Sequence, residues 1–406
     1  MIDSNFYTML LSVFYPFWSL GTTLLYSVMG VVGCIAIYYT QKQLVAVPFY
    51  KKKCYVYWFL CWTIFAAFRL IEGGAGGEDA NAYYLYFLKS FNIHGYELTP
   101  LGLYDSNLGF RWYNRILRLI SDNQMYFLFV THGIMLAFVI KFLDYFRFRK
   151  MSIVPFFLVV FWYIRGFCTI RSNLATAILL LSLIFLVDKR YKQSIVLAII
   201  SFLFHKMMIL YALFIPFYWY SQHKKISFKQ IIIAILLLSL STTLLTTYIF
   251  GGNVFGSDFS EHYSNYSDAS MEVGFSGNFW KIAFEQIILG GMLFLFRKKI
   301  MTAASKMSPL EFKKFQVIWY ACLFDCLLIP VCSAFGIWRG YEIFYIPRLV
   351  MWAILLKVLE PRSVKLQTIY FILCVGLFYG WFLQRTSAES FWKETSLMPY
   401  VFNNPL

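Results

Sequence analysis

Arg165, Arg171, His205 and Lys206 interrupt the apolar, membrane-like segments within residues 161–220. An ionisable group at bilayer depth costs a few kcal/mol or more, so such groups normally mark a cavity, a pathway or a binding site. A guanidinium is always charged and binds phosphate through two parallel hydrogen bonds. The two arginines therefore suit a diphosphate. The alternative is that they snorkel to lipid headgroups.

The residues after Arg171 strengthen this interpretation. A helix that opens near Arg171 presents free backbone amides at its first turn, and these amides attract anions. Asn173 lies in the same turn and adds a further polar side chain.

The pair His205 and Lys206 lies between two apolar runs. Histidine changes its charge near neutral pH and is the commonest general base in enzymes. His205 is therefore a candidate base. The alternative is a buried histidine whose ring is satisfied by a backbone carbonyl.

Three further groups of charged residues lie beside or within predicted spans. Glu78 and Asp79 follow a glycine-rich turn and come soon after Arg69; they suit a general base, a sugar ligand or a salt-bridge partner of an arginine. Arg339 and Glu342 are three residues apart and would share a helix face. Arg348 lies within the next apolar run and is a second candidate anion ligand.

The composition requires a membrane environment for these groups. The chain has 406 residues, of which 60% are hydrophobic, and a soluble core could not bury so much apolar surface. The net charge is +16, and most of the lysines and arginines lie in short loops on one side of the predicted topology. This is the positive-inside bias of membrane proteins, so the charge does not indicate a nucleic-acid-binding surface. The eight cysteines form no CxxC motif, so neither a zinc site nor a disulfide framework is predicted.

Apolar runs predict an all-α polytopic protein with about twelve transmembrane helices in one membrane domain, residues 1–406. The predicted spans lie near residues 20–40, 54–71, 122–143, 151–165, 171–187, 191–205, 206–220, 228–250, 279–297, 315–334, 341–358 and 366–384. Residues 191–220 could instead form one long helix, but that would place the later basic loops outside. The charge bias favours two short segments.

This topology predicts short basic cytoplasmic loops and two long external loops, residues 72–121 and 251–278. The external loops combine carboxylates, amides and tyrosines, which is the chemistry of a carbohydrate site. In the second loop the candidate sugar ligands are Asp258, Glu261 and His262. The alternative is that both loops are ordinary solvated connections.

At these segments the chain resembles the EpsG/Wzy-like polysaccharide polymerases of bacteria, which make O-antigen, capsule or exopolysaccharide. Asp79 followed by Tyr83 and Tyr84 resembles the family's early acidic motif, although the neighbouring residues depart from its usual wording. Residues 171–175, the basic turn 188–192 and the pair Phe204 and His205 resemble its central element. Residues 339–344 resemble a later arginine motif, a role that Arg348 could also fill.

The resemblance implies a GT-C-like, metal-independent glycosyltransferase of the bacterial plasma (inner) membrane, with its active site on the periplasmic or external side. Donor and acceptor would be undecaprenyl-diphosphate-linked oligosaccharides. The implied diphosphate ligands are Arg165, Arg171, Lys206, Arg69 and Arg339 or Arg348. His205 or Asp79, with Glu78 beside it, would take the hydroxyl proton. The implied sugar ligands add Asn173, Tyr83 and Tyr84 to those of the second external loop.

Beyond the lipid bilayer, the resemblance implies a chain-length regulator and a flippase as partners, and no cofactor or nucleic acid. Two other functions remain open. An O-antigen ligase would use similar arginines to transfer a finished glycan. A lipid-linked oligosaccharide flippase or transporter would also have about twelve spans, but it should show two similar halves, and no internal repeat is present.

Overall fold

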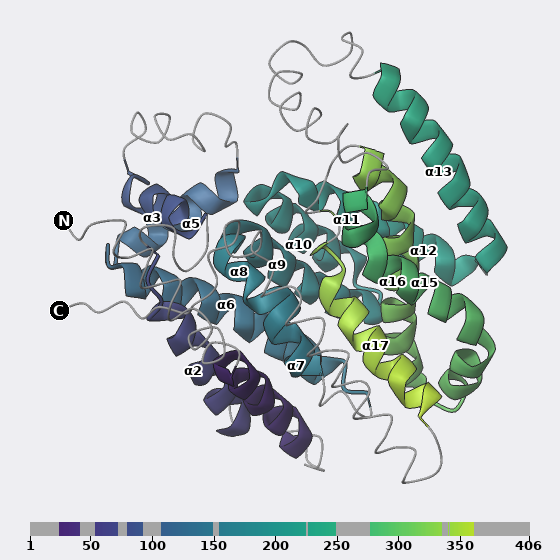
Figure 1. Ribbon diagram of the computed structural model, residues 1–406, viewed down its shortest axis with the longest axis horizontal. Helices are drawn as coiled ribbons and strands as arrows, with labels where there is room; N and C mark the ends of the chain where they lie inside the picture. Colours follow the sequence, from purple (N-terminus) through teal and green to yellow (C-terminus); the bar gives the residue numbers. More distant parts are fainter. Residues whose placement is uncertain are drawn as a thin grey trace. The chain divides into compact units, whose positions relative to one another are not determined.

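The computed structural model describes residues 24–40, 53–71, 79–91, 107–148, 154–224, 226–248, 277–334, 340 and 342–360 (Figure 1). Every regular element in these ranges is a helix, and no β-strand occurs in them. The all-α prediction is therefore confirmed for the described part of the chain. The last predicted span, residues 366–384, lies outside the described residues.

Helix boundaries follow the predicted spans closely. Three helices are long and apolar enough to cross a membrane: Gln124–Tyr145, Ile170–Val187 and Pro309–Cys332. Shorter apolar helices cover Leu24–Thr40, Tyr191–Phe204 and Lys229–Ser241. These are counts for the described ranges only, so the prediction of about twelve spans stays a prediction.

The chain divides into two compact units, residues 1–177 with 359–406, and residues 178–358. The boundary falls within helix α9 (Ile170–Val187). Besides the start of α9, the first unit contains the helix Leu24–Thr40, α2 (Lys53–Ala67), α3 (Ala80–Leu88), α5 (Leu108–Arg118), α6 (Gln124–Tyr145), α7 (Val154–Leu158), η3 (Val159–Tyr163) and α8 (Arg165–Cys168).

Aromatic side chains form the core of the first unit. The ring of Trp62 in α2 lies 5.4 Å from that of Trp58 and 4.7 Å from that of Tyr163 in η3. The indole nitrogen of Trp62 donates to the carbonyl of Met29 at 2.8 Å, and the hydroxyl of Tyr163 donates to the carbonyl of Trp62 at 2.8 Å. Large rings thus bury apolar area while their polar atoms tie three helices together.

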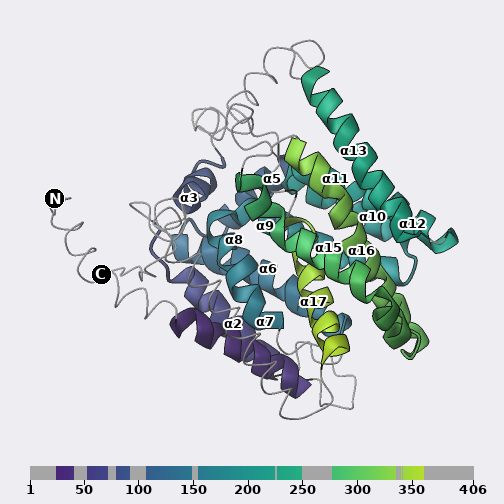
Figure 2. The same ribbon diagram turned by 45° about the vertical axis from the view of Figure 1, so that its right-hand side comes forward.

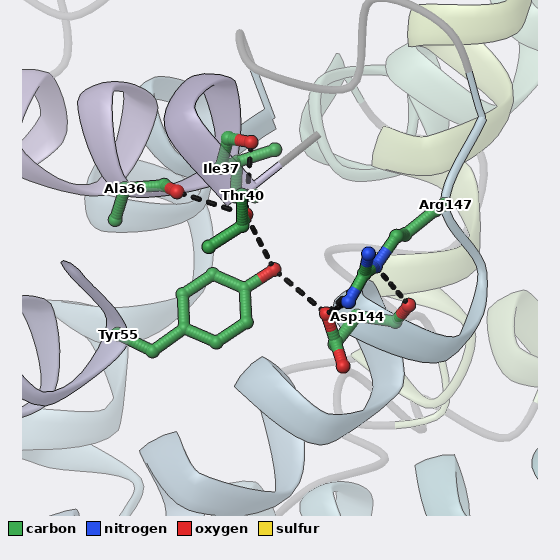
Figure 3. Close-up of polar contacts among 6 residues, drawn as sticks. All are labelled: Ala36, Ile37, Thr40, Tyr55, Asp144 and Arg147. Carbon is green, nitrogen blue, oxygen red and sulfur yellow. Dashed lines mark hydrogen bonds and ion pairs between the residues drawn. The ribbon is translucent and has the colours of Figure 1, made fainter. Parts of the chain in front are cut away.

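A second polar connection joins three helices of this unit at the ends that the charge pattern predicts to be cytoplasmic. Figure 3 shows the hydroxyl of Tyr55 between Thr40 and Asp144. Tyr55 donates to Asp144 at 3.0 Å, and the Thr40 hydroxyl lies 2.9 Å from the Tyr55 oxygen. Arg147 pairs with the same carboxylate. The network satisfies every one of these polar groups, so it holds the helix ends without leaving a buried charge unpaired.

The connection of residues 72–121, predicted as a long external loop, contains the two helices α3 and α5. Helix α5 buries Phe110, Asn114 and Leu117, which recur at the spacing of one helix face. Arg115 of α5 donates to the carbonyl of Ser90 at 2.8 Å, and Tyr84 of α3 donates to the carbonyl of Asp122 at 3.0 Å. These contacts fasten the two helices to the unit.

Within the described ranges, the second unit contains the rest of α9, seven further α-helices and one 3-10 turn: α10 (Tyr191–Phe204), η4 (Lys206–Met208), α11 (Ile209–Ala212), α12 (Phe214–His223), α13 (Phe228–Tyr248), α15 (Gly277–Ala304), α16 (Pro309–Ala334) and α17 (Tyr345–Leu359). Helix α16 packs against α12, α13 and α15, which lie beside it in Figure 2.

Local sequence explains the sharp turn between α15 and α16. Ser308 and Glu311 form a capping box: the Ser308 amide donates to the Glu311 carboxylate at 3.1 Å, and the Glu311 amide donates to the Ser308 hydroxyl at 3.4 Å. Pro309 occupies the first helical position, where its missing N–H costs nothing. Helix α16 therefore begins where the sequence signals a start.

We expect Gly33→Ala to destabilise the first unit. A Cβ atom there would lie 2.5 Å from the Cβ of Pro155 and 3.0 Å from the ring of Trp58, so a helix must move. Overpacking of this kind costs about 1–3 kcal/mol. A lower melting temperature of the purified protein in detergent would show it.

Gly291→Ala in α15 is the matched control, because no heavy atom lies within 4 Å of its added Cβ. It should leave the melting temperature unchanged or raise it, since alanine favours a helix interior by about 1 kcal/mol over glycine. Equal destabilisation by both variants would contradict the close approach at Gly33.

Candidate functional site

The segment that carries Arg165 and Arg171 is a broken helix. Helix α7 passes into the π-helical turn η3, in which the amide of Ile164 donates to the carbonyl of Val159 at 2.9 Å. The four-residue helix α8 follows, and the chain leaves helical geometry at Thr169 before α9 begins at Ile170. Single π-turns inside helices are frequent at functional sites. The break places Arg165 in α8 and Arg171 in the first turn of α9.

Asn173 holds this break together. Its amide nitrogen donates to the carbonyl of Trp162 at 2.8 Å, and its amide oxygen accepts from the hydroxyl of Thr169 at 3.2 Å. A Cβ atom at Gly166 would lie 2.7 Å from this nitrogen, so glycine leaves room for the amide. Asn173 is buried and bonded within the protein, so it ties the first turn of α9 to η3. Its predicted role as a sugar ligand stays a prediction.

Arg171 faces the predicted acidic motif. Its guanidinium carbon lies 5.9 Å from the ring centroid of Tyr83 in α3, and this ring is set edge-to-face against Phe110 of α5. Asp79 immediately precedes α3, and its carbonyl accepts from the amide of Tyr83 at 3.0 Å. Residues four apart share a helix face, so Asp79 adjoins the same face as Tyr83. The first unit thus places Arg171, Tyr83 and Asp79 in one neighbourhood.

Arg69 adjoins the same broken helix. It follows the end of α2, is fully buried, and lies with its guanidinium carbon 4.2 Å from the ring centroid of Phe167 in α8. Its Nη1 donates to the carbonyl of Ala66. Gln124, the first residue of α6, donates to the Arg69 carbonyl at 3.4 Å. A cation–π contact and backbone bonds therefore fix this charge in the interior.

Tyr84 points to a different contact from its neighbour Tyr83. Its hydroxyl bonds the carbonyl of Asp122, and its ring stacks at 6.1 Å on that of Phe87. Other predicted site residues lie outside the described residues: Glu78, Asp258, Glu261, His262 and Arg339. The side chain of Arg165 also lies outside what is described, although its backbone belongs to α8.

His205 marks the second helix break, which lies in the second unit. Helix α10 ends at Phe204, His205 is extended at φ −153° and ψ 117°, and η4 begins at Lys206. The break at His205 excludes one unbroken helix over residues 191–220, and the second segment is itself divided into η4, α11 and α12. That each of the two segments crosses the membrane stays a prediction. The ring of His205 is buried, and its Nδ1 accepts from the amide of Met207 at 3.3 Å. Because Nδ1 is an acceptor, the neutral ring carries its proton on Nε2. Lys206 is exposed.

Arg348 is paired in the interior of the second unit. Its Nε lies 3.2 Å from Oδ2 of Asp325 in α16, and both side chains are almost completely buried. The other carboxylate oxygen of Asp325 accepts from the amide of Gln286 in α15 at 2.7 Å. The ring of Tyr345 lies 4.6 Å from the guanidinium carbon. The Asp325 carboxylate therefore offsets the free-energy cost of burying the Arg348 charge. The sequence analysis did not single out Asp325.

Asp325 had a signal in the sequence, since it is the one acidic residue within the apolar run of residues 315–334. His132 in α6 was also missed, although it is a histidine within an apolar run and so had the same kind of signal.

No three His, Cys, Asp or Glu side chains gather to hold a metal ion within the described ranges. Metal independence stays a prediction.

Comparison with known proteins decides the family. The model of the EpsG family matches residues 54–402, which include Asp79, Arg171 and His205. The chain belongs to the EpsG family. The predicted resemblance is confirmed, and membership of the EpsG family indicates a polysaccharide polymerase-type role for this membrane protein. No curated protein and no solved structure matches the chain.

The buried pair of this EpsG-family protein can be tested by removing one charge or both. Asp325→Ala leaves Arg348 buried without its carboxylate, and breaking such a pair costs about 3–5 kcal/mol. We expect a lower melting temperature in detergent and less protein in the membrane.

The double variant Asp325→Leu with Arg348→Met is the control, because well-packed apolar residues often replace a buried ion pair without loss of stability. It should recover the wild-type melting temperature. A double variant as unstable as Asp325→Ala would show that the pair is not what stabilises this contact. A stable double variant that makes no polymer would support the predicted diphosphate role of Arg348.

Proposed function

We propose that this protein is a polysaccharide polymerase that joins undecaprenyl-diphosphate-linked repeat units by glycosyl transfer on the external face of the bacterial plasma membrane. The match of the EpsG family model over residues 54–402 carries the proposal. The grouping of Arg69, Arg171, Tyr83 and Asp79 around one broken helix supports it, because glycosyl transfer from a lipid diphosphate needs cations for the leaving group and a base for the acceptor.

The departing lipid diphosphate sets the main electrostatic demand of the reaction. As the bond between the anomeric carbon and the diphosphate oxygen breaks, its electron pair moves to that oxygen. Preorganised cations aimed at the developing charge stabilise the transition state more than the ground state. Arg171 sits at the start of α9, where the helix amides add to its attraction for an anion. Arg69 supplies a second fixed charge beside α8.

The acceptor hydroxyl oxygen forms the new bond to the anomeric carbon and must lose its proton. Asp79 is the base that the geometry favours, because it adjoins the helix face whose Tyr83 lies against Arg171. Arginines perform the charge stabilisation that a metal ion performs in other transferases, so the mechanism needs no metal. Tyr83 and Tyr84 supply flat rings near the reacting sugar.

His205 fits a positioning role better than that of a base. Its Nδ1 lone pair is engaged by the amide of Met207, and the neutral ring then offers a donor at Nε2. In that state it can donate to an oxygen but has no open lone pair to accept a proton. The predicted substrate-binding roles of His205, Lys206 and Arg348, which belong to the second unit, stay predictions.

We expect Arg171→Ala to abolish chain extension while the protein remains in the membrane. Cells that lack the protein, complemented with either form, would be compared by glycan length on gels. Wild type should restore a ladder, and the variant should leave single repeat units. Arg190→Ala is the control, since Arg190 is exposed in the turn before α10.

Normal ladders with Arg171→Ala would contradict the assignment of Arg171 to the diphosphate. Full-length polymer stranded on its lipid carrier in the deletion strain would indicate a ligase instead. Repeat units accumulating on the cytoplasmic face would indicate a flippase.

Asp79→Asn should lower the rate of chain extension by about 100-fold or more, because a positioned general base typically contributes that factor. The amide keeps the size of the side chain and removes its basicity. Rates would be followed as incorporation of labelled repeat units into polymer by membranes. Asp188→Asn, at an exposed carboxylate after α9, should extend chains as wild type does. Unchanged rates with Asp79→Asn would exclude Asp79 as the base.

A further inference from the structure

Several buried side chains of the first unit, Asn114, Thr63 and His132 among them, have polar atoms with no hydrogen-bond partner among the described residues. His132 lies in α6 and is fully buried, and neither its Nδ1 nor its Nε2 has a hydrogen-bond partner among the described residues. Buried polar groups are nearly always hydrogen-bonded, to the protein, to water or to a ligand. An imidazole with two open nitrogens therefore points to a bound group that both nitrogens could meet.

The surroundings of His132 define what that group can be. The ring lies edge-on to Tyr163 at 5.7 Å and to Phe167 at 5.3 Å. The guanidinium of Arg69 covers the same Phe167 ring at 4.2 Å, and Arg69 and His132 interact electrostatically. The imidazole thus shares its aromatic neighbour with a permanent cation. Such a pair repels a second cation and attracts an anion.

A further buried polar side chain lies on α2, the helix that packs against α6. Thr63 of α2 is fully buried, and its hydroxyl has no hydrogen-bond partner within the described ranges. Its methyl group lies 3.5 Å from the position of a Cβ at Gly133, the residue after His132. Buried polar atoms without a partner among the described residues therefore occur on both α2 and α6, which pack against each other.

We propose that His132 and Arg69 form a buried binding site for a phosphate group. In this site the protonated ring nitrogen of neutral His132 donates a hydrogen bond to a phosphate oxygen. The site rests on the proposed function for its natural ligand, the diphosphate of the lipid-linked donor. The second ring nitrogen is an acceptor, and it suits a hydroxyl such as those of the attached sugar or of Thr63. Both nitrogens would be satisfied only when substrate is bound.

The depth of the site agrees with this ligand. His132 is about 12 Å along the axis of α6 from Gln124, by the rise of an α-helix. If α6 crosses a hydrocarbon layer of about 30 Å with Gln124 at one surface, His132 lies in the half of the layer that adjoins the start of α6. Arg69 is also at that end, since Gln124 donates to its carbonyl. A phosphate drawn to Arg69 from that end of the helix meets His132 next.

His132→Phe tests the proposal because phenylalanine keeps a flat ring against Tyr163 and Phe167 and removes both nitrogens. The full-length protein, purified in detergent, would be titrated with undecaprenyl diphosphate while its thermal unfolding is followed. Without ligand, the variant should unfold at or above the wild-type temperature, since two unsatisfied polar atoms are gone. It should bind the lipid diphosphate at least about tenfold more weakly, which is the contribution of one hydrogen bond to a charged group.

Controls separate the site from general effects. His223→Phe makes the same change at an exposed position at the end of α12 and should bind as wild type does. His132→Gln keeps an N–H donor and should recover part of the lost affinity. Parallel titrations with phosphatidylglycerol distinguish a phospholipid headgroup phosphate from the lipid diphosphate as the source of the ligand.

Two results would overturn the proposal. Wild-type affinity in His132→Phe would show that His132 does not bind the phosphate. Marked destabilisation of His132→Phe without ligand would show that the ring nitrogens are satisfied within the protein. The proposed function fails separately: if deletion strains make normal polymer, yet wild type binds lipid diphosphate and His132→Phe does not, the phosphate site stands without the polymerase.

Discussion

The cost of an ionisable group inside an apolar helical bundle governs the rest of this structure. Each buried charge must find a counter-charge, an aromatic face or a ligand. Arg348 finds Asp325, and Arg69 finds the ring of Phe167 and the carbonyl of Ala66. The ring of His132 packs edge-to-face against Tyr163 and Phe167, but its nitrogens have no hydrogen-bond partner in the described part of the chain. A ligand is therefore the expected partner of His132.

The same constraint explains where the helices break. An unbroken helix satisfies its own backbone and offers nothing to a polar ligand, whereas a break exposes amides and carbonyls that need partners. At the break between η3 and α9, the amide nitrogen of Asn173 donates a hydrogen bond to the carbonyl of Trp162. At the break after α10, the ring of His205 takes the amide of Met207.

The remaining polar contacts hold the scaffold. The network of Thr40, Tyr55 and Asp144 joins three helix ends, and Trp62 and Tyr163 join helices in the core of the same unit. These side chains are mutually satisfied, in contrast to the open nitrogens of His132.

The sequence by itself determined the family, most of the helices with their approximate ends, and the break at His205, because apolar run length, capping residues and short motifs are local properties of the chain. It did not predict α3 and α5, which lie in the segment predicted as an external loop. It also singled out Arg171, Asp79 and Arg348 as unusual charges. Only the tertiary structure decided their partners. Asp325 is far from Arg348 in sequence, Asn173 turned out to bond the helix before it, and His132 acquired its meaning from Arg69 and Phe167. Such pairings depend on which helix faces pack together, and packing between distant segments leaves no signature in a local pattern of residues.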